Sequence, residues 1–341
     1  MNTEEEKQLR KRFISDKNLP IQVIQNPFFE ERLDLFERKF EARTKYDKLL
    51  NRINRKYDGN ASKFLEAYNS IRDKIVTECS TSQAFQDFNA EDMSKYALPS
   101  DIVGNVNLYT QQNTDEDDNF YVSFDLKKAN FQALKFANPD IVFNADTYID
   151  FIEHFTKSEY VKTSKYTRQV IFGKMNPKRT MTVEKFLIYK VYQLIADAIK
   201  VWGKPFSMNS DEIIYKLNKK LFDDLDITTI SNLEKIIKET LNLDVRVIKF
   251  RLHYHKFNLA TSKATLNVFE KDCFYPMSAD YMCVPTIYAP QVYKMLTKQK
   301  INDDDLVFYH EHELVRFLNP LILDMENEAK IDAKRYDDLP F

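Results

Sequence analysis

The hydrophobic positions of the first hundred residues repeat with the period of an α-helix. Phe29, Leu33, Phe36 and Phe40 follow one another at spacings of four, three and four, which places them on one helical face. Gly59 interrupts the rhythm, and a second amphipathic stretch of the same kind follows it. The pattern therefore predicts a helical N-terminal region packed around a continuous apolar stripe.

The pattern changes to a period of two at residues 120–126. Alternate residues of a strand point to opposite faces of a sheet, so Phe120, Val122 and Phe124 are expected to pack inward. The opposite face then carries Tyr121, Ser123 and Asp125. We expect a strand that delivers a carboxylate to its C-terminal end.

Four further elements complete an order of strand, helix, hairpin, helix and strand. The expected elements are a helix at 184–198, a hairpin at 203–217 with its turn at Asn209–Asp211, a helix at 230–243 and a strand at 245–257. This order predicts an α+β fold with a split βαβ (ferredoxin-like) sheet that has its helices on one face. The open face would bring Asp125 beside Asp211.

The remaining residues predict a mixed C-terminal region. The expected elements are strands at 264–269 and 281–287, a helix at 291–298 and a charged helix at the C-terminus. We therefore divide the chain into a helical region at 1–105, a catalytic region at 106–260 and an accessory region at 261–341.

The composition indicates which class of protein and which cellular compartment to expect. The chain has 341 residues, of which 43% are hydrophobic, and three cysteines without C-x-x-C spacing. These features favour a globular protein in a reducing compartment. No stretch approaches the roughly 18 apolar residues that span a bilayer, and the charged start lacks the apolar core of a signal peptide. We expect a soluble, intracellular protein of the cytoplasm, or of the nucleus, without a membrane partner.

The net charge of −2 means that binding to nucleic acid would depend on local basic stripes. The last strand of the expected sheet offers one, because its basic side chains alternate with apolar ones. They are Lys249, Arg251, His253 and His255. This stripe suits a duplex backbone, and an exposed sheet face protected by charge has the same pattern.

Three acids are the candidates for chemistry. Asp125 ends the first strand, and Asp211 and Glu212 follow the hairpin turn. Carboxylates gathered at one sheet edge can bind divalent metals, and two metals can drive phosphoryl transfer. The alternative is structural, since Asp125 precedes a helix and Asn209-Ser-Asp211 is common turn chemistry.

Three segments together resemble the palm of reverse-transcriptase-like polymerases. Asp125-Leu-Lys-Lys-Ala129-Asn130 resembles the first palm motif, D-L-K-x-A. Residues 171–177, Ile-Phe-Gly-Lys-Met-Asn-Pro, are similar to the P-F-G-x-x-x-P segment, with Ile171 in place of the first proline. Ser210-Asp211-Glu212 stands where the family has its paired-Asp hairpin, with Glu as the second acid. An S-D-E hairpin is also similar to the palms of translesion polymerases and of tRNA-His guanylyltransferases, although the latter have Gly where this chain has Leu126.

The resemblance implies roles for individual residues. Asp125 and Asp211 would bind two Mg²⁺ or Mn²⁺ ions, with Glu212 assisting. Asn130 stands where reverse transcriptases usually place an aromatic residue that excludes a ribose 2′-hydroxyl, so ribonucleotides would be tolerated. Cations available to a triphosphate or a template are Lys127, Lys128, Arg168, Lys174, Lys178 and Arg179. The partners would be an RNA or DNA template with its primer, nucleoside triphosphates and, for the regions without an assigned role, other proteins of a larger complex.

Three functions compete on this basis. The first is template-directed nucleotidyl transfer by a metal-dependent polymerase. The second is a palm-derived subunit that has lost turnover and binds nucleic acid or supports an assembly. The third is guanylyltransferase-like addition to RNA ends. Neither a P-loop nor a G-x-G-x-x-G motif is present, so ATPase and dinucleotide-binding functions lack support.

Overall fold

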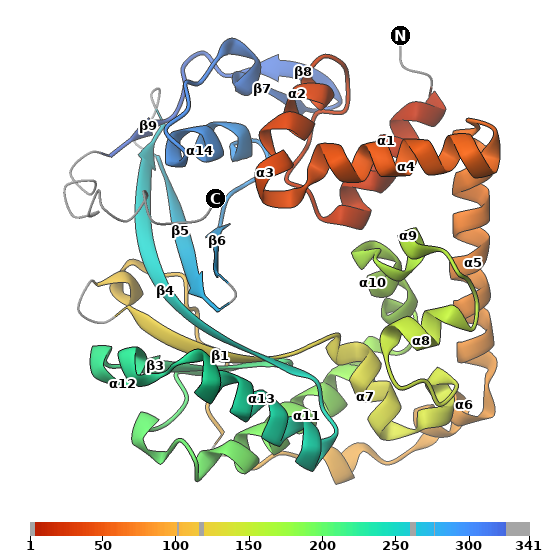
Figure 1. Cartoon of the computed structure of the whole chain (residues 1–341), viewed down its shortest axis with the longest axis vertical. Coiled ribbons are helices and arrows are strands. Elements are labelled where there is room, and N and C mark those ends of the chain that lie inside the picture. The colour runs from red at the N-terminus through yellow and green to blue at the C-terminus, as the bar shows by residue number, and fades with distance from the viewer. Residues whose placement is uncertain (1–3, 101, 116–118, 260–263, 276, 325–341) are drawn as a thin grey trace.

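The computed structural model describes residues 4–100, 102–115, 119–259, 264–275 and 277–324. The N-terminal region is helical, as its hydrophobic period predicts, and Phe29, Leu33 and Phe36 are fully buried. Its helices are α1 (Glu4–Lys17), α2 (Phe28–Leu35), α3 (Glu37–Phe40), α4 (Ala42–Tyr57), α5 (Ala61–Thr81) and α6 (Gln83–Ala90). They form the upper and right-hand parts of the molecule in Figure 1.

An antiparallel sheet runs down the other side of the molecule (Figure 1). Its strand order is β2-β3-β1-β4-β5-β6, and β9 pairs with the end of β4. The strands are β1 (Phe120–Leu126), β2 (Ser207–Met208), β3 (Glu212–Leu217), β4 (Val245–Asn258), β5 (Thr265–Phe274), β6 (Met277–Met282) and β9 (Ile322–Leu323). The expected hairpin is confirmed, because β2 and β3 pair across a turn at 209–211. The fold is α+β.

Helices that lie between the strands in the chain cover one face of the sheet. The side chains of Phe120, Val122 and Phe124 enter the same hydrophobic core as those of α11 and α13, which lie below β1 in Figure 1. The opposite face is covered by a smaller cluster around Tyr121 and Phe250, and it becomes partly exposed at Asp125. These helices are α7 (Ala129–Ala137), α8 (Tyr148–Glu153), α9 (Glu159–Lys162), α10 (Lys165–Gly173), α11 (Pro177–Ala196), α12 (Lys219–Asp224) and α13 (Ile227–Leu241), with 3₁₀ turns η1 (Met93–Tyr96), η2 (Gln111–Thr114), η3 (Pro139–Val142) and η4 (Lys200–Trp202). Within the described residues, no helix is both long and apolar enough to cross a bilayer.

The C-terminal region differs from the sequence expectation in its boundaries. β5 continues to Phe274 because the long strand β4 offers it a partner over nine residue pairs. The strand expected at 281–287 is instead β6, which pairs with β5. The last elements are α14 (Ala289–Leu296), η5 (Asp303–Leu306), β7 (Val307–His310) and β8 (Glu313–Arg316). The helix expected at the C-terminus lies outside the described residues.

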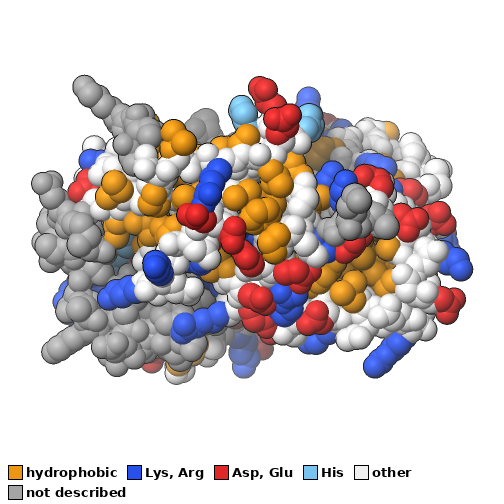
Figure 2. Space-filling view, turned by 90° about the horizontal axis from the view of Figure 1, so that it is seen from above, with side chains coloured by type: hydrophobic (Ala, Val, Ile, Leu, Met, Phe, Trp, Pro, Cys, Tyr) orange, Lys and Arg blue, Asp and Glu red, His pale blue; other side chains and the backbone are white. Residues whose placement is uncertain are grey.

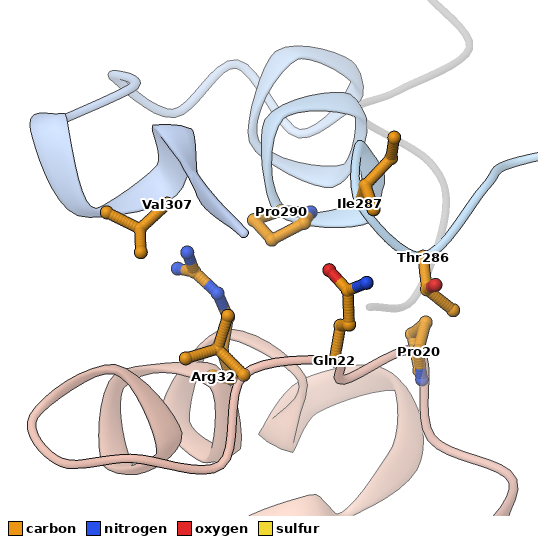
Figure 3. A pocket seen from close by; sticks show the side chains of 8 residues that line it. Pro20, Gln22, Arg32, Thr286, Ile287, Pro290 and Val307 are labelled. Atoms are coloured by element: carbon orange, nitrogen blue, oxygen red, sulfur yellow. The ribbon is translucent and has the colours of Figure 1, made fainter. Parts of the chain in front are cut away.

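The two ends of the chain pack against each other and close the molecule into a ring-like outline (Figure 1). Arg32 of α2 and Asp305 of η5 form an ion pair of 3.0 Å that is almost fully buried. Beside it lies a small cavity of about 10 Å³, and Figure 3 shows Gln22 and Arg32 facing Pro290 and Val307 across it. Such a volume holds about one water molecule, so this cavity belongs to packing rather than to ligand binding.

One hydrophobic core runs through residues of all three regions that the sequence analysis distinguished, from Leu9 to Tyr293. A smaller cluster in the C-terminal region contains Phe257, Val268, Val292, Leu296 and Leu321. The division at residues 105 and 260 stays a prediction.

Candidate functional site

The acids of the site come from the C-terminal end of β1 and the neighbouring turn. Asp125 lies directly opposite Glu212 of β3 and opposite Arg246 of β4. Directly opposed residues of an antiparallel pair share one face, so these side chains gather on the face of the sheet that carries Tyr121 and Phe250. Asp211 is joined to the same end, because its carbonyl accepts a hydrogen bond of 2.8 Å from the amide of Leu126.

The turn that presents the acids is held by its own sequence. The side-chain oxygen of Asn209 accepts hydrogen bonds from the amides of Asp211 at 2.9 Å and Glu212 at 2.7 Å. This is the local side-chain-to-backbone bonding for which Asn is favoured in turns. The turn therefore fixes two acids next to a third without help from distant residues.

The surroundings of Asp211 and Glu212 disfavour the charged forms of these two acids. Burial raises the pKa of Asp211, and the negative charge of Asp125 raises it further. Burial also raises the pKa of Glu212, although Lys271 and the hydroxyl of Ser123 act in the opposite direction. Acids that repel each other in a half-buried site are characteristic of functional clusters.

Two cations that the sequence analysis did not select face the acids. Arg246 Nη2 lies 3.0 Å from Asp125 Oδ2, and Lys271 Nζ lies 4.0 Å from Glu212 Oε1. The register of β1 against β4 places Arg246 opposite Asp125, so strand alternation alone could have revealed it. Lys271 comes from β5, whose pairing with β4 the sequence did not define.

Glu184 is a further acid that the sequence analysis missed. It belongs to α11 and is 5% exposed. Burial and then the charge of Asp211 raise its pKa to about 7, and the amide of Asn130 donates a hydrogen bond to its Oε1 and opposes that shift. The signal was present in the sequence, since Glu184 interrupts an otherwise apolar helical stripe. Asn130 is thus tied to the acids, and its expected role at a ribose hydroxyl stays a prediction.

The fit to divalent metals depends on the donor chemistry. In the described part of the chain, no group of three or more His, Cys, Asp or Glu side chains is arranged to hold a metal ion. Asp125 and Asp211 nevertheless offer carboxylate oxygens, the ligands that Mg²⁺ prefers. Burial and then the charge of Asp125 raise the pKa of Asp211. A divalent ion would relieve that repulsion and would compete with Arg246 for Asp125. The two carboxylates are thus of the ligand type that Mg²⁺ prefers.

Two of the six expected phosphate-binding cations converge on one aromatic ring. Lys128 Nζ lies 5.1 Å and the Arg168 guanidinium 6.0 Å from the centre of the Tyr148 ring. Burial and the charge of Arg168 lower the pKa of Lys128. The hydroxyl of Tyr148 is buried and has no hydrogen-bond partner among the described residues. Two cations that repel each other beside an unsatisfied hydroxyl make a suitable place for an anion.

The other expected cations lie elsewhere. Lys127 is exposed next to Lys128 and Lys178 is exposed near the start of α11. Lys174 Nζ is 3.9 Å from Asp73 of α5, and Arg179 donates to the backbone carbonyl of Glu91. These last two cations connect α10 and α11 to the N-terminal region.

The basic stripe on β4 is not the exposed surface that either interpretation of the sequence assumed. Lys249 is 6% exposed and donates to the carbonyl of Leu225 at 2.8 Å, because the segment around α12 covers this part of the sheet. His255 is 2% exposed and lies 2.9 Å from Glu270. The guanidinium of Arg251 lies over the ring of Phe120, 5.0 Å from its centre, and His253 is partly exposed. Lys249 and His255 are therefore not available to a nucleic-acid backbone in this conformation.

Comparisons with models of known protein families, with curated proteins and with solved structures gave no match.

Proposed function

We propose that this protein catalyses metal-dependent, template-directed nucleotidyl transfer from nucleoside triphosphates. The observation that carries the proposal is the meeting of Asp125, Asp211 and Glu212 at one sheet end, where burial and then the charge of Asp125 raise the pKa of Asp211. Structural acids usually have cationic partners that favour their charged form. Asp125 and Glu212 have such partners in Arg246 and Lys271, but Asp211 forms no ion pair within the described residues, which suits a site that receives cations from solution.

Each acid of the site has its own role in the proposed reaction. Asp125 and Asp211 would hold two Mg²⁺ or Mn²⁺ ions, which supply activation of a primer hydroxyl and neutralise charge on the triphosphate. Glu212, positioned by Ser123 and Lys271, would orient this pair. Glu184 borders the site and stays partly protonated near pH 7.

The cations at Tyr148 supply the place for the triphosphate. Lys128 is only three residues from Asp125 in the chain, so their Cα atoms are at most about 11 Å apart. A triphosphate held between Lys128 and Arg168 would thus lie within reach of the metal-binding acids. Charged hydrogen bonds to phosphate oxygens would also offset the mutual repulsion of the two cations.

The topology supports a polymerase palm as the scaffold. The strand order β2-β3-β1-β4, with α11 and α13 on one face, matches the split βαβ sheet expected from the sequence. The motifs at Asp125, at 171–177 and at Asp211 are similar to those of reverse-transcriptase-like polymerases. We infer that the enzyme works on an RNA or DNA template with a primer.

One observation favours a second candidate, a palm-derived subunit without turnover. Arg246 already pairs with Asp125 at 3.0 Å, and a permanent ion pair would keep a metal away. Arg246 is half-exposed, however, and an ion pair of this kind is worth only about 0–1 kcal/mol. A divalent ion can displace such a partner, so we favour the enzyme.

Incorporation of labelled nucleoside triphosphates on primed RNA and DNA templates tests the proposal. The double substitution Asp125→Asn/Asp211→Asn should lower the rate by about 1,000-fold or more, equivalent to about 4 kcal/mol of transition-state stabilisation. The matched control is Asp223→Asn/Asp224→Asn, which removes two exposed carboxylates from α12. Extension by the wild type and the control but not by the site variant supports the enzyme. Absence of extension in all three, with primer–template still bound, would favour the subunit.

A further inference from the structure

A groove on the N-terminal helices is the second place where charge is concentrated. It has a volume of about 870 Å³ and lies between α4 on one side and residues 157–165 on the other, with the end of α1 at its base. In Figure 1 these elements are at the upper right, across the molecule from β1 and β3. Eight of the fifteen lining residues are cations: Lys17, Lys45, Lys48, Arg52, Arg55, Lys56, Lys157 and Lys165.

The cations of α4 form a continuous stripe. Lys45, Lys48, Arg52, Arg55 and Lys56 follow at spacings of three, four, three and one, which keeps them on one side of the helix. The stripe spans about 16 Å at 1.5 Å per residue. The buried side of α4, with Ala42, Tyr46, Leu49 and Ile53, adjoins this stripe, and Leu49 also lines the groove.

Most of this charge is not neutralised inside the protein. Among the described residues, no carboxylate lies within ion-pairing distance of six of the eight cations, which are Lys17, Lys48, Arg52, Arg55, Lys56 and Lys165. Lys45 pairs with Glu41 at 3.1 Å, and Lys157 pairs with Glu153 at 3.5 Å. The Nε of Arg52 is buried and has no hydrogen-bond partner. In a chain of net charge −2, so many unpaired cations in one groove are not a consequence of overall composition.

The two acids of the groove do little to cancel its field. Asp16 is 1% exposed and accepts hydrogen bonds from Tyr68 and Tyr160, both at 2.7 Å. Burial raises its pKa, which favours its neutral form. Glu159 is already paired with Lys162 at 2.6 Å.

The base of the groove is rigid. Lys17 Nζ donates to the hydroxyl of Thr163 at 3.1 Å and lies 4.7 Å from the centre of the Tyr160 ring. Burial lowers the pKa of Lys17, the charge of Asp16 opposes this shift, and Lys45 adds to it. Lys45 thus adds a second positive charge beside Lys17 on this side of the groove. The face in Figure 2 differs from this groove, because acidic, basic and hydrophobic side chains are mixed there.

We propose that this groove binds the sugar–phosphate backbone of a single nucleic-acid strand. A row of cations along a helix matches a row of phosphates, and the second basic wall at Lys157 and Lys165 encloses a strand from the other side. The described lining offers no exposed aromatic ring for base stacking, since Tyr160 is 7% exposed, so binding is expected to be independent of sequence and dependent on salt. The choice of nucleic acid among polyanions rests on the proposed function.

Fluorescence anisotropy of labelled 16-mers of oligouridylate and oligodeoxythymidylate, without metal or nucleotide, tests this groove. Lys48→Gln/Arg55→Gln/Lys56→Gln should weaken binding at least 10-fold at 100 mM NaCl. The slope of log affinity against log salt should also become shallower by about 2, at about 0.7 per lost phosphate contact. The control Lys204→Gln/Lys219→Gln/Lys220→Gln removes three exposed lysines far from the groove and should bind like the wild type. A second variant, Lys157→Gln/Lys165→Gln, changes the opposite wall and should also weaken binding.

Three outcomes would overturn the proposal. The first is a groove variant with wild-type affinity and salt slope. The second is equal losses in the groove and control variants, and the third is binding of ATP at the groove in place of the 16-mers. The assay contains neither metal nor nucleotide, so a failure of the catalytic proposal leaves this result unaffected.

Discussion

Two acidic sites in this protein are built in opposite ways. Asp305, where η5 packs against α2, is 1% exposed, and its carboxylate receives Arg32 at 3.0 Å, Lys294 at 2.6 Å and the amide of Asn302 at 2.8 Å. The acids at the end of β1 are partly exposed and lie beside one another; Asp125 and Glu212 each face one cation, and the pKa of Asp211 is raised by burial and by Asp125. The first site fully pairs its charge, and the second leaves Asp211 without an ion pair among the described residues.

The difference separates a structural role from a functional one. A buried carboxylate with two cations and a backbone amide is stable as it stands and fixes how the chain ends meet. A cluster that disfavours its own charge lowers stability, and proteins retain such clusters mainly where a ligand uses them. The same type of residue thus indicates closure of the molecule in one place and chemistry in the other.

The largest expected effect on stability is at Asp305. Asp305→Asn leaves Arg32 buried without its counter-charge, which should lower the free energy of unfolding by about 3–5 kcal/mol. Urea denaturation followed by circular dichroism measures this change. Asp303→Asn, at an exposed neighbouring acid, is the control and should change stability by less than about 0.5 kcal/mol. Equal stability of the Asp305 variant and the wild type would refute the structural role of this ion pair.

Local residues allowed the sequence to predict the acidic edge but not what surrounds it. The alternation of Phe120–Asp125 and the turn chemistry of Asn209 depend on neighbours in the chain, and both the strand and the hairpin are confirmed. The exposure of Lys249 depends on α12 crossing the sheet, which alternation does not encode. Glu184 was overlooked because its helix was interpreted by its apolar stripe alone.

The basic groove beside α4 is a second feature that the sequence did not predict. The helical period of residues 42–57 was visible as a pattern of apolar positions, and the sequence analysis did not single out the basic residues between them. Only the packing of α4 beside residues 157–165 brings cations from distant segments together. Charge clusters built from several elements therefore require the tertiary structure.

Glu184, whose pKa the charge of Asp211 helps to raise, should make the stability of the protein depend on pH. Its pKa is about 7 in the folded protein against an ordinary value of 4.5, so the folded state binds the proton more tightly. The protein should lose stability from this group as the pH rises from about 4.5 to 7, and the full loss, up to about 3 kcal/mol, persists above pH 7. Glu184→Gln should flatten that part of the pH profile. Urea titrations at pH 5, 6, 7 and 8 measure it, with Glu66→Gln at an exposed site of α5 as the control.

Divalent ions should reverse the instability of the acidic edge. At a concentration ten times the dissociation constant, Mg²⁺ or Mn²⁺ should stabilise the wild type by about 1.4 kcal/mol. Thermal melting with and without the ion measures this shift. The variant Asp125→Asn/Asp211→Asn should lose it, whereas Asp223→Asn/Asp224→Asn should keep it. An identical shift in all three proteins would place the ion elsewhere.

The smallest expected effect is the most direct test of the comparison, because it repeats the Asp305 change at the other acid set. Asp211→Asn removes a charge that burial and Asp125 disfavour, and Asn keeps the shape of the side chain. Without metal at pH 8, we expect stability to rise by about 0.5–1 kcal/mol while nucleotide incorporation is lost. Opposite signs for one substitution at Asp305 and Asp211 would establish the two roles. A loss of stability at both positions would mean that Asp211 is a structural acid of the turn, and the site would then have to be built without it.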